Sequence, residues 1–190
     1  MRFLLMTFAC GALFAQELPE WWKALPVLPH LESRFVQESD SAVFGKIRRT
    51  GRLQMSRGGR LRVAYDKGLL VVSDGKTLVQ LDGGARTAQK SDLRTVAQET
   101  PLLRILLDPK ALAEIYRAKA LHAGTLTLEP LKPGLPKVEV EGQGRFLKKM
   151  TWTDPTGAKQ VLELLDPKAP AYLPDSTYKI KVPEGTRWLP

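Results

Sequence analysis

Apolar and polar residues alternate along residues 53–82, and glycine-containing turns interrupt the alternation at short intervals. From Leu53 to Ser56 and from Leu61 to Tyr65, odd positions are apolar or aromatic and most even positions are polar or charged. A period of two is typical of β-strands with one apolar and one polar face. Gly58-Gly59 and Asp74-Gly75 lie where such strands would reverse direction. The stretch therefore predicts consecutive antiparallel strands that share one apolar surface.

The same alternation predicts further strands before and after this stretch. Residues 114–121 fit either a helix or a strand, and the turn at 122–124 favours a strand paired with 125–129. Gly45 and Gly51 indicate bends, which a strongly curved sheet needs. The sum is one domain of roughly ten short antiparallel strands. The other expected strands are residues 33–39, 43–56, 137–141, 146–153, 160–164 and 178–182.

Helices are expected near the start and in the middle of the chain. Trp21, Trp22 and Leu25 share one side of a short helix that Pro26 ends. Residues 91–100 have helical spacing, and Thr100-Pro101 then resembles a helix start. Residues 102–107 are apolar except for one arginine. Such a helix must be covered by other parts of the protein or must itself cover another apolar surface. On periodicity alone, a helix that packs into an ordinary core is the favoured interpretation.

The N-terminal residues predict export. Arg2 precedes the apolar run Phe3–Phe14, which predicts a secretory signal over residues 1–15, cleaved after Ala15, with the domain at 16–190. The run is too short to span a bilayer as a helix. A lipoprotein signal cut before Cys10 is the alternative. Cleavage after Ala15 would leave no cysteine and hence no disulfide, which suits a bacterial periplasm.

Charge and motifs narrow the function further. The net charge of +9 favours acidic partners such as anionic lipid headgroups or acidic proteins, and export argues against nucleic acid. A basic surface that only keeps the protein in solution explains the charge equally well. Gly75-Lys76-Thr77 lacks the earlier glycine of a phosphate-binding loop. Gly142-Gln143-Gly144 lacks the third glycine of a dinucleotide turn, and we expect it to relieve crowding in a strand bend. We predict no catalytic residue, metal site or cofactor, and a protein that is not an enzyme.

An apolar face on a curved sheet, an apolar helix and an export signal point to a binder of lipid or acyl chains. Five segments also resemble, in order, motifs of the outer-membrane lipoprotein carrier family (LolA-like proteins). Ser56–Tyr65 is similar to Lys/Ser-Arg-Pro-Gly-Lys-Phe-Arg-Trp-x-Tyr, and Val72–Asp82 to Val-Ser-Asp-Gly-Lys-Thr-Leu-Trp-x-Tyr-Asp. Phe35–Gln37 matches Phe-x-Gln, Thr100–Leu107 the Thr-Pro helix, and Tyr178–Gly185 resembles Phe-x-Phe-x-x-Pro-x-Gly.

The resemblance implies an α+β fold in which a curved antiparallel sheet forms an incomplete β-barrel, with helices as a lid over a hydrophobic cavity. It implies a monomeric periplasmic carrier that shields the acyl chains of lipoproteins. The implied partners are acylated lipoproteins, an inner-membrane ABC-type lipoprotein exporter and an outer-membrane lipoprotein acceptor. Alternatives of related fold are a carrier or sensor of another envelope lipid, such as a glycolipid, and a lipid-anchored outer-membrane acceptor.

The resemblance also assigns site residues. Arg57 resembles the arginine that holds the closed lid through backbone carbonyls, although a solvated turn arginine is the simpler interpretation. Val63, Val79, Leu61 and Leu81 replace residues that are usually aromatic in the carriers, which leaves the cargo open. The residues expected to line the acyl cavity are Phe35, Leu53, Met55, Leu61, Val63, Tyr65, Leu78, Leu102, Leu103 and Leu106.

Overall fold

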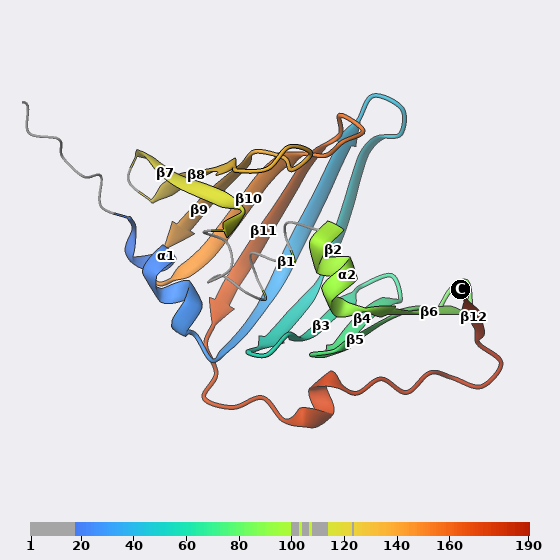
Figure 1. Ribbon diagram of the computed structural model, residues 1–190. Coiled ribbons are helices and arrows are strands. Elements are labelled where there is room, and N and C mark those ends of the chain that lie inside the picture. Colours follow the sequence, from blue (N-terminus) through green and yellow to red (C-terminus); the bar gives the residue numbers. More distant parts are fainter. Residues whose placement is uncertain (1–17, 100–102, 104–106, 108–113, 123) are drawn as a thin grey trace, which may run out of the picture.

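The structure is a computed structural model that describes residues 18–99, 103, 107, 114–122 and 124–190. Twelve strands lie in the described part: β1 His30–Ser41, β2 Gly45–Ser56, β3 Arg60–Tyr65, β4 Leu69–Asp74, β5 Thr77–Asp82, β6 Thr87–Asp92, β7 Tyr116–His122, β8 Thr125–Pro130, β9 Val138–Gln143, β10 Phe146–Thr153, β11 Lys159–Lys168 and β12 Arg187–Leu189. They form a single sheet in the order β12-β6-β5-β4-β3-β2-β1-β11-β10-β9-β8-β7. The outermost strands β12 and β7 do not pair with each other, so the sheet is an open, incomplete barrel (Figure 1).

Two long central strands bring the halves of the sheet together. β1 and β2 are each 12 residues long and pair antiparallel over their whole length. At their centre Gly51 lies opposite Phe35, and a Cβ at Gly51 would collide with the Phe35 ring and the Ala64 carbonyl. The glycine that the sequence associates with a bend therefore makes room for an inward-facing aromatic ring.

The core lies on the concave side of the sheet. Inward-facing side chains from β1, β2, β3 and β8 to β11 form one buried apolar cluster. Its fully buried members include Leu61, Leu126, Leu128, Val140 and Leu164, each no more than 1% exposed. Along most of these strands the alternation buries one face and leaves the other more exposed, as the sequence predicts. In β8 both faces are buried, because Thr127 lies between Leu126 and Leu128 and is 1% exposed.

Two short helical segments and one longer helix lie along this concave side. α1 (Glu20–Ala24) continues into the 3-10 turn η1 (Leu25–Val27), and α2 (Leu93–Glu99) follows β6 directly. Trp21 of α1 is 2% exposed and packs against Gly142 of β9, where a Cβ would overlap the indole. Its Nε1 also donates to the Gly124 carbonyl oxygen at 3.0 Å. Gly142 therefore makes room for the Trp21 indole. The sequence predicted that this glycine relieves crowding in a strand bend, whereas the crowding group is a side chain of α1.

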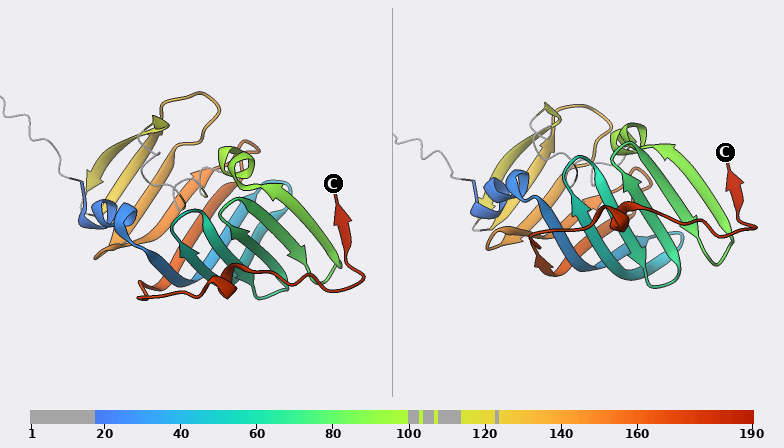
Figure 2. Two further views of the ribbon diagram at one scale, coloured as in Figure 1. Left: turned by 60° about the horizontal axis from the view of Figure 1, so that its bottom comes forward. Right: turned by 90° about the horizontal axis from the view of Figure 1, so that it is seen from below.

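The C-terminal segment crosses the outer face of the sheet (Figure 2). Its 3-10 turn η3 (Asp175–Tyr178) packs against β3 and β4. The predicted strand at 178–182 is wrong, because no strand forms there. The side chains of Tyr178, Ile180 and Val182 are buried or half-buried, in alternation with exposed residues. A segment that runs across strands buries alternate side chains without forming a ladder. The chain ends in β12, which pairs parallel with β6, so the sheet is not wholly antiparallel.

The other expected strands are present, with boundaries that differ by a few residues, and residues 116–122 form a strand rather than a helix. The signal at residues 1–15 lies outside the described residues. Of the apolar helix expected at 100–107, only Leu103 and Leu107 are described, and both are helical. Within the described part of the chain, no helix combines the length and hydropathy needed to cross a bilayer.

Candidate ligand-binding site

An apolar pocket of about 260 Å³ lies between the concave face of the sheet and α2. We call it the inner pocket. Its floor comes from β1 to β5 and β11, and Val96 of α2 and Leu103 close it from the opposite side. The residues that line it are Phe35, Gln37, Leu53, Leu61, Val63, Tyr65, Val71, Leu78, Gln80, Val96, Leu103 and Leu162.

The structure brings most of the expected cavity residues together in this pocket. Phe35, Leu53, Leu61, Val63, Tyr65, Leu78 and Leu103 all line it. Met55 lies beside them in a second, smaller pocket near α1. Leu102 and Leu106 lie outside the described residues.

The sequence missed several lining residues. Val71 lies in the run Leu69–Val72, where both faces are apolar and the alternation gives no direction. Leu162 was within an expected strand, but only its register against Gln37 shows that it faces the pocket. On β5 the pocket-lining residues are Leu78 and Gln80, so Val79 and Leu81 point to the outer face. At four positions this chain has an aliphatic residue where the carriers usually have an aromatic one. Two of these, Val79 and Leu81, therefore do not line the inner pocket.

Aromatic and amide groups mark the boundary of the apolar region. The Phe35 and Tyr65 rings meet edge to face with centroids 5.1 Å apart. The Tyr65 hydroxyl donates to Oε1 of Gln37 at 2.9 Å. Burial raises the pKa of Tyr65, and the nearby positive charge of Arg49 opposes this rise. Tyr65 thus joins the apolar floor to a polar region farther along β1 and β2.

Arg57 lies in the turn between β2 and β3, beside the second pocket. Gly58 and Gly59 have φ angles of 77° and 78°, which lets the turn reverse tightly. The Arg57 side chain donates from Nε to the Leu28 carbonyl oxygen at 3.3 Å and from a terminal nitrogen to the Pro26 carbonyl oxygen. Its backbone nitrogen donates to the Pro29 carbonyl oxygen at 3.2 Å. Arg57 is therefore bonded to the segment that follows α1.

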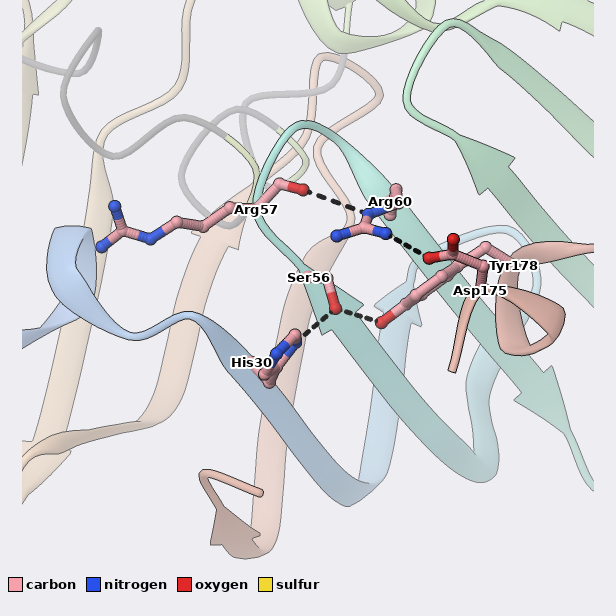
Figure 3. Close-up of polar contacts among 6 residues, drawn as sticks. All are labelled: His30, Ser56, Arg57, Arg60, Asp175 and Tyr178. Carbon is pink, nitrogen blue, oxygen red and sulfur yellow. Dashed lines mark hydrogen bonds and ion pairs between the residues drawn. The ribbon is translucent and has the colours of Figure 1, made fainter. Parts of the chain in front are cut away.

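The other side of this turn is bonded to the C-terminal segment (Figure 3). Ser56 Oγ lies 2.6 Å from His30 Nδ1 and 2.5 Å from the Tyr178 hydroxyl. Arg60 forms an ion pair with Asp175 at 2.6 Å, and its guanidinium lies 5.5 Å from the Tyr178 ring centroid. Figure 3 shows Arg57 extending away from Arg60 and Tyr178. The turn is held between two segments on opposite sides.

The lining of the inner pocket favours physical enclosure of an apolar ligand. Most of its side chains are hydrocarbon or aromatic, and the polar ones are two amides and a phenol. In the described parts of the chain, no three His, Cys, Asp or Glu side chains are grouped so that they could hold a metal ion. Such a site gains affinity from the apolar surface it removes from water.

Together these features define a class of protein: a half-open β-barrel with an apolar pocket enclosed by helices. Residues 28–181 match the family described as outer membrane lipoprotein carrier protein LolA, and the chain belongs to this family. No protein of curated function matches the chain.

Solved structures are similar to this chain at low sequence identity, and those with a TM-score of 0.50 or more share its fold. An uncharacterized conserved protein from Thermus thermophilus is 11% identical with a TM-score of 0.57, and the match covers 90% of this chain and 96% of that one. MucB is 17% identical with a TM-score of 0.50, covering 85% of this chain and 62% of MucB. A LolA superfamily protein from Nitrosomonas europaea is 8% identical with a TM-score of 0.48, covering 86% of this chain and 99% of that one.

Proposed function

We propose that the protein carries lipoproteins through the periplasm by enclosing their acyl chains in the inner pocket. The pocket itself is the observation that supports this best, because its floor is apolar and helical residues enclose it. Burial of an acyl chain is worth about 0.8 kcal/mol per methylene group. A lipidated protein therefore needs such an enclosure to cross water at a useful rate.

We further propose that Arg57 holds closed the α1 side of the helical lid, which borders the second pocket. Its side-chain bonds to the Pro26 and Leu28 carbonyl oxygens support this role, because both acceptors follow α1 directly. A guanidinium has five donors in a rigid plane, which suits two acceptors on one segment. These bonds are exposed to solvent, so each is weak enough to break when the lid opens.

The remaining parts of the proposal follow from family membership. The protein would act in the periplasm after removal of residues 1–15. It would receive lipoproteins from an inner-membrane ABC-type exporter and deliver them to an outer-membrane acceptor. It would do so as a monomer and by binding alone, without catalysis.

The test is to identify what the protein binds after secretion into the periplasm. We expect mass spectrometry of the purified protein to find lipoprotein-derived acyl groups. Val63→Glu places a carboxylate in the inner pocket and should abolish this cargo. Ala64→Glu makes the same charge change on the opposite face of β3 and should retain it. Equal loss in both variants, or no acyl group in the native protein, would refute the proposal.

The lid hypothesis has a separate test. Arg57→Leu should load acyl cargo but pass it poorly to an acceptor, since the closed lid loses both side-chain bonds. Arg52→Leu removes an exposed arginine from the outer face of β2 and should transfer cargo normally. Normal transfer by Arg57→Leu would count against the lid role.

The alternatives differ in cargo or anchoring. A glycolipid or other envelope lipid in the purified protein would favour a carrier or sensor of that lipid. Leu61 and Val63 support this alternative, because both line the pocket where the carriers usually have aromatic residues. Incorporation of labelled palmitate at Cys10 would instead favour a lipid-anchored acceptor.

A further inference from the structure

A polar pocket of about 250 Å³ adjoins the inner pocket along β1 and β2. We call it the mouth pocket. It is lined by Gln37, Ser39, Ile47, Arg49 and Gln160, and Gln37 also lines the inner pocket. Each volume alone is slightly below the range of about 300–1,000 Å³ that is usual for ligand sites, whereas the two joined fall within it.

Strand register sets the order of apolar and polar groups along this joined space. Phe35 lies opposite Gly51, and the next inward-facing pair toward the β1–β2 turn is Gln37 opposite Arg49. Two residues of a strand span about 7 Å, so the change from apolar to polar is abrupt. An elongated ligand with one polar end matches this order.

Arg49 gives the mouth pocket its charge. Among the inward-facing positions of β1, β2 and β3, all of them described, Arg49 is the only charged residue. No carboxylate pairs with it among the described residues, whereas Arg48 on the opposite face is paired with Glu38 at 3.4 Å. The opposing effect of Arg49 on the Tyr65 pKa places its charge near the Tyr65 hydroxyl. A cation at this boundary favours an anionic group on the ligand.

The neighbouring amides are oriented by other residues. Gln37 accepts from Tyr65 through Oε1, and its Nε2 has no hydrogen-bond partner among the described residues, so it can donate to a ligand. Gln160 donates from Nε2 to Ser39 Oγ at 2.8 Å and to Asp154 Oδ2 at 2.9 Å. Asp154 is therefore engaged by Gln160, and it does not line the mouth pocket. The mouth pocket thus offers a guanidinium and an amide N–H as donors.

We propose that the joined pockets take an acyl amphiphile whose polar end carries an anionic oxygen. The chain lies over Phe35 and Leu53 in the inner pocket, and the carboxylate or phosphate oxygen binds Arg49 and Gln37. This inference rests on the acyl-binding part of the proposed function and goes beyond it. The acyl chains of a lipoprotein end in ester and amide groups, so an anionic ligand would favour the alternative cargo, another envelope lipid.

The experiment compares ligands that share one chain. Dodecanoate, dodecyl phosphate and dodecanol are titrated into the full-length protein and binding is measured by calorimetry. Both anionic ligands should bind more tightly than dodecanol. Arg49→Gln should weaken both by about fivefold to tenfold and leave dodecanol binding unchanged. If only one anion shows the effect, the headgroup is thereby identified as carboxylate or phosphate.

Arg48→Gln is the matched control. It removes the same charge from the adjacent residue on the outer face, so it should leave all three affinities unchanged. If both variants weakened the binding of the anionic ligands equally, the effect would come from long-range attraction to the positive charge of the protein, which would overturn the proposal. Dodecanol binding as tight as that of the anions would also overturn it while leaving the proposed function standing. Failure of every ligand to bind would overturn both.

Discussion

The packing of Trp21 against Gly142 makes the attachment of α1 directly testable. Gly142 faces inward on β9, and a Cβ at this position would overlap Cγ and neighbouring atoms of the indole. Gly142 does not have a positive φ angle, so alanine is compatible with its backbone. Gly142→Ala should therefore act mainly by pushing the Trp21 indole out of its place, since the three atoms nearest to the added Cβ all belong to that ring.

The magnitude follows from the burial of Trp21, which is 2% exposed. Truncation of a buried tryptophan to alanine costs about 3–5 kcal/mol of unfolding free energy, and forcing an extra methyl group into a packed site costs about 1–3 kcal/mol. We expect Gly142→Ala to cost about 2–4 kcal/mol, since the indole is partly displaced. Each kcal/mol lowers Tm by about 2–4 °C for a chain of this size.

A double-mutant cycle isolates this contact. Urea unfolding followed by circular dichroism gives the free energy for the native protein, Gly142→Ala, Trp21→Ala and the double variant. In the Trp21→Ala background the added methyl group meets no indole, so Gly142→Ala should then be neutral within about 0.5 kcal/mol. Gly84→Ala is the control, because its Cβ would make only an ordinary 3.4 Å contact with Asp82. An equal cost of Gly142→Ala in both backgrounds would refute the reasoning.

Two further predictions concern pH. Burial raises the pKa of Tyr116 from 10.0 to about 12, so its contribution to stability is complete below pH 10 and is lost as pH rises toward 12. Alkaline unfolding should show this loss, and Tyr116→Phe should remove that part of it; identical pH profiles would contradict the assignment. Hydrogen bonds from the Thr77 and Lys76 backbone lower the pKa of Asp74, so its contribution is present above its ordinary value of 3.8 and is lost as pH falls below that value. Asp74→Ala should cost about 0.5–1.5 kcal/mol at neutral pH and less in acid, and a cost independent of pH would argue against the turn role.

The sequence best predicted those elements that have one solvent-exposed face and one buried face. β3 is such an element, because Arg60 and Arg62 alternate with Leu61, Val63 and Tyr65. Its inward face could therefore be assigned from period two alone. The Asp-Gly pair predicted the hairpin at Asp74-Gly75 just as clearly. In the structure, Asp74 Oδ1 accepts hydrogen bonds from the two backbone nitrogens that follow the glycine.

Elements covered on both faces could not be oriented in this way. Leu69–Val72 is apolar throughout because η3 covers the outer face of β4 while the inner pocket lies on the other. The alternation at 178–182 is real, but period two reports which side chains turn inward and not whether the backbone forms a ladder. Contacts between distant segments, such as Trp21 with Gly142, leave no local pattern.

The prolines after α1 explain how Arg57 reaches its acceptors. In a longer first helix the N–H groups of His30 and Glu32 would donate to the Pro26 and Leu28 carbonyls. Pro29 disfavours continuation of the helix, and His30 and Glu32 both lie in β1 instead. Both carbonyls are therefore left without helical partners, and the Arg57 side chain, 29–31 residues away, supplies the donors. The short first helix thus provides the acceptors that the proposed lid role requires.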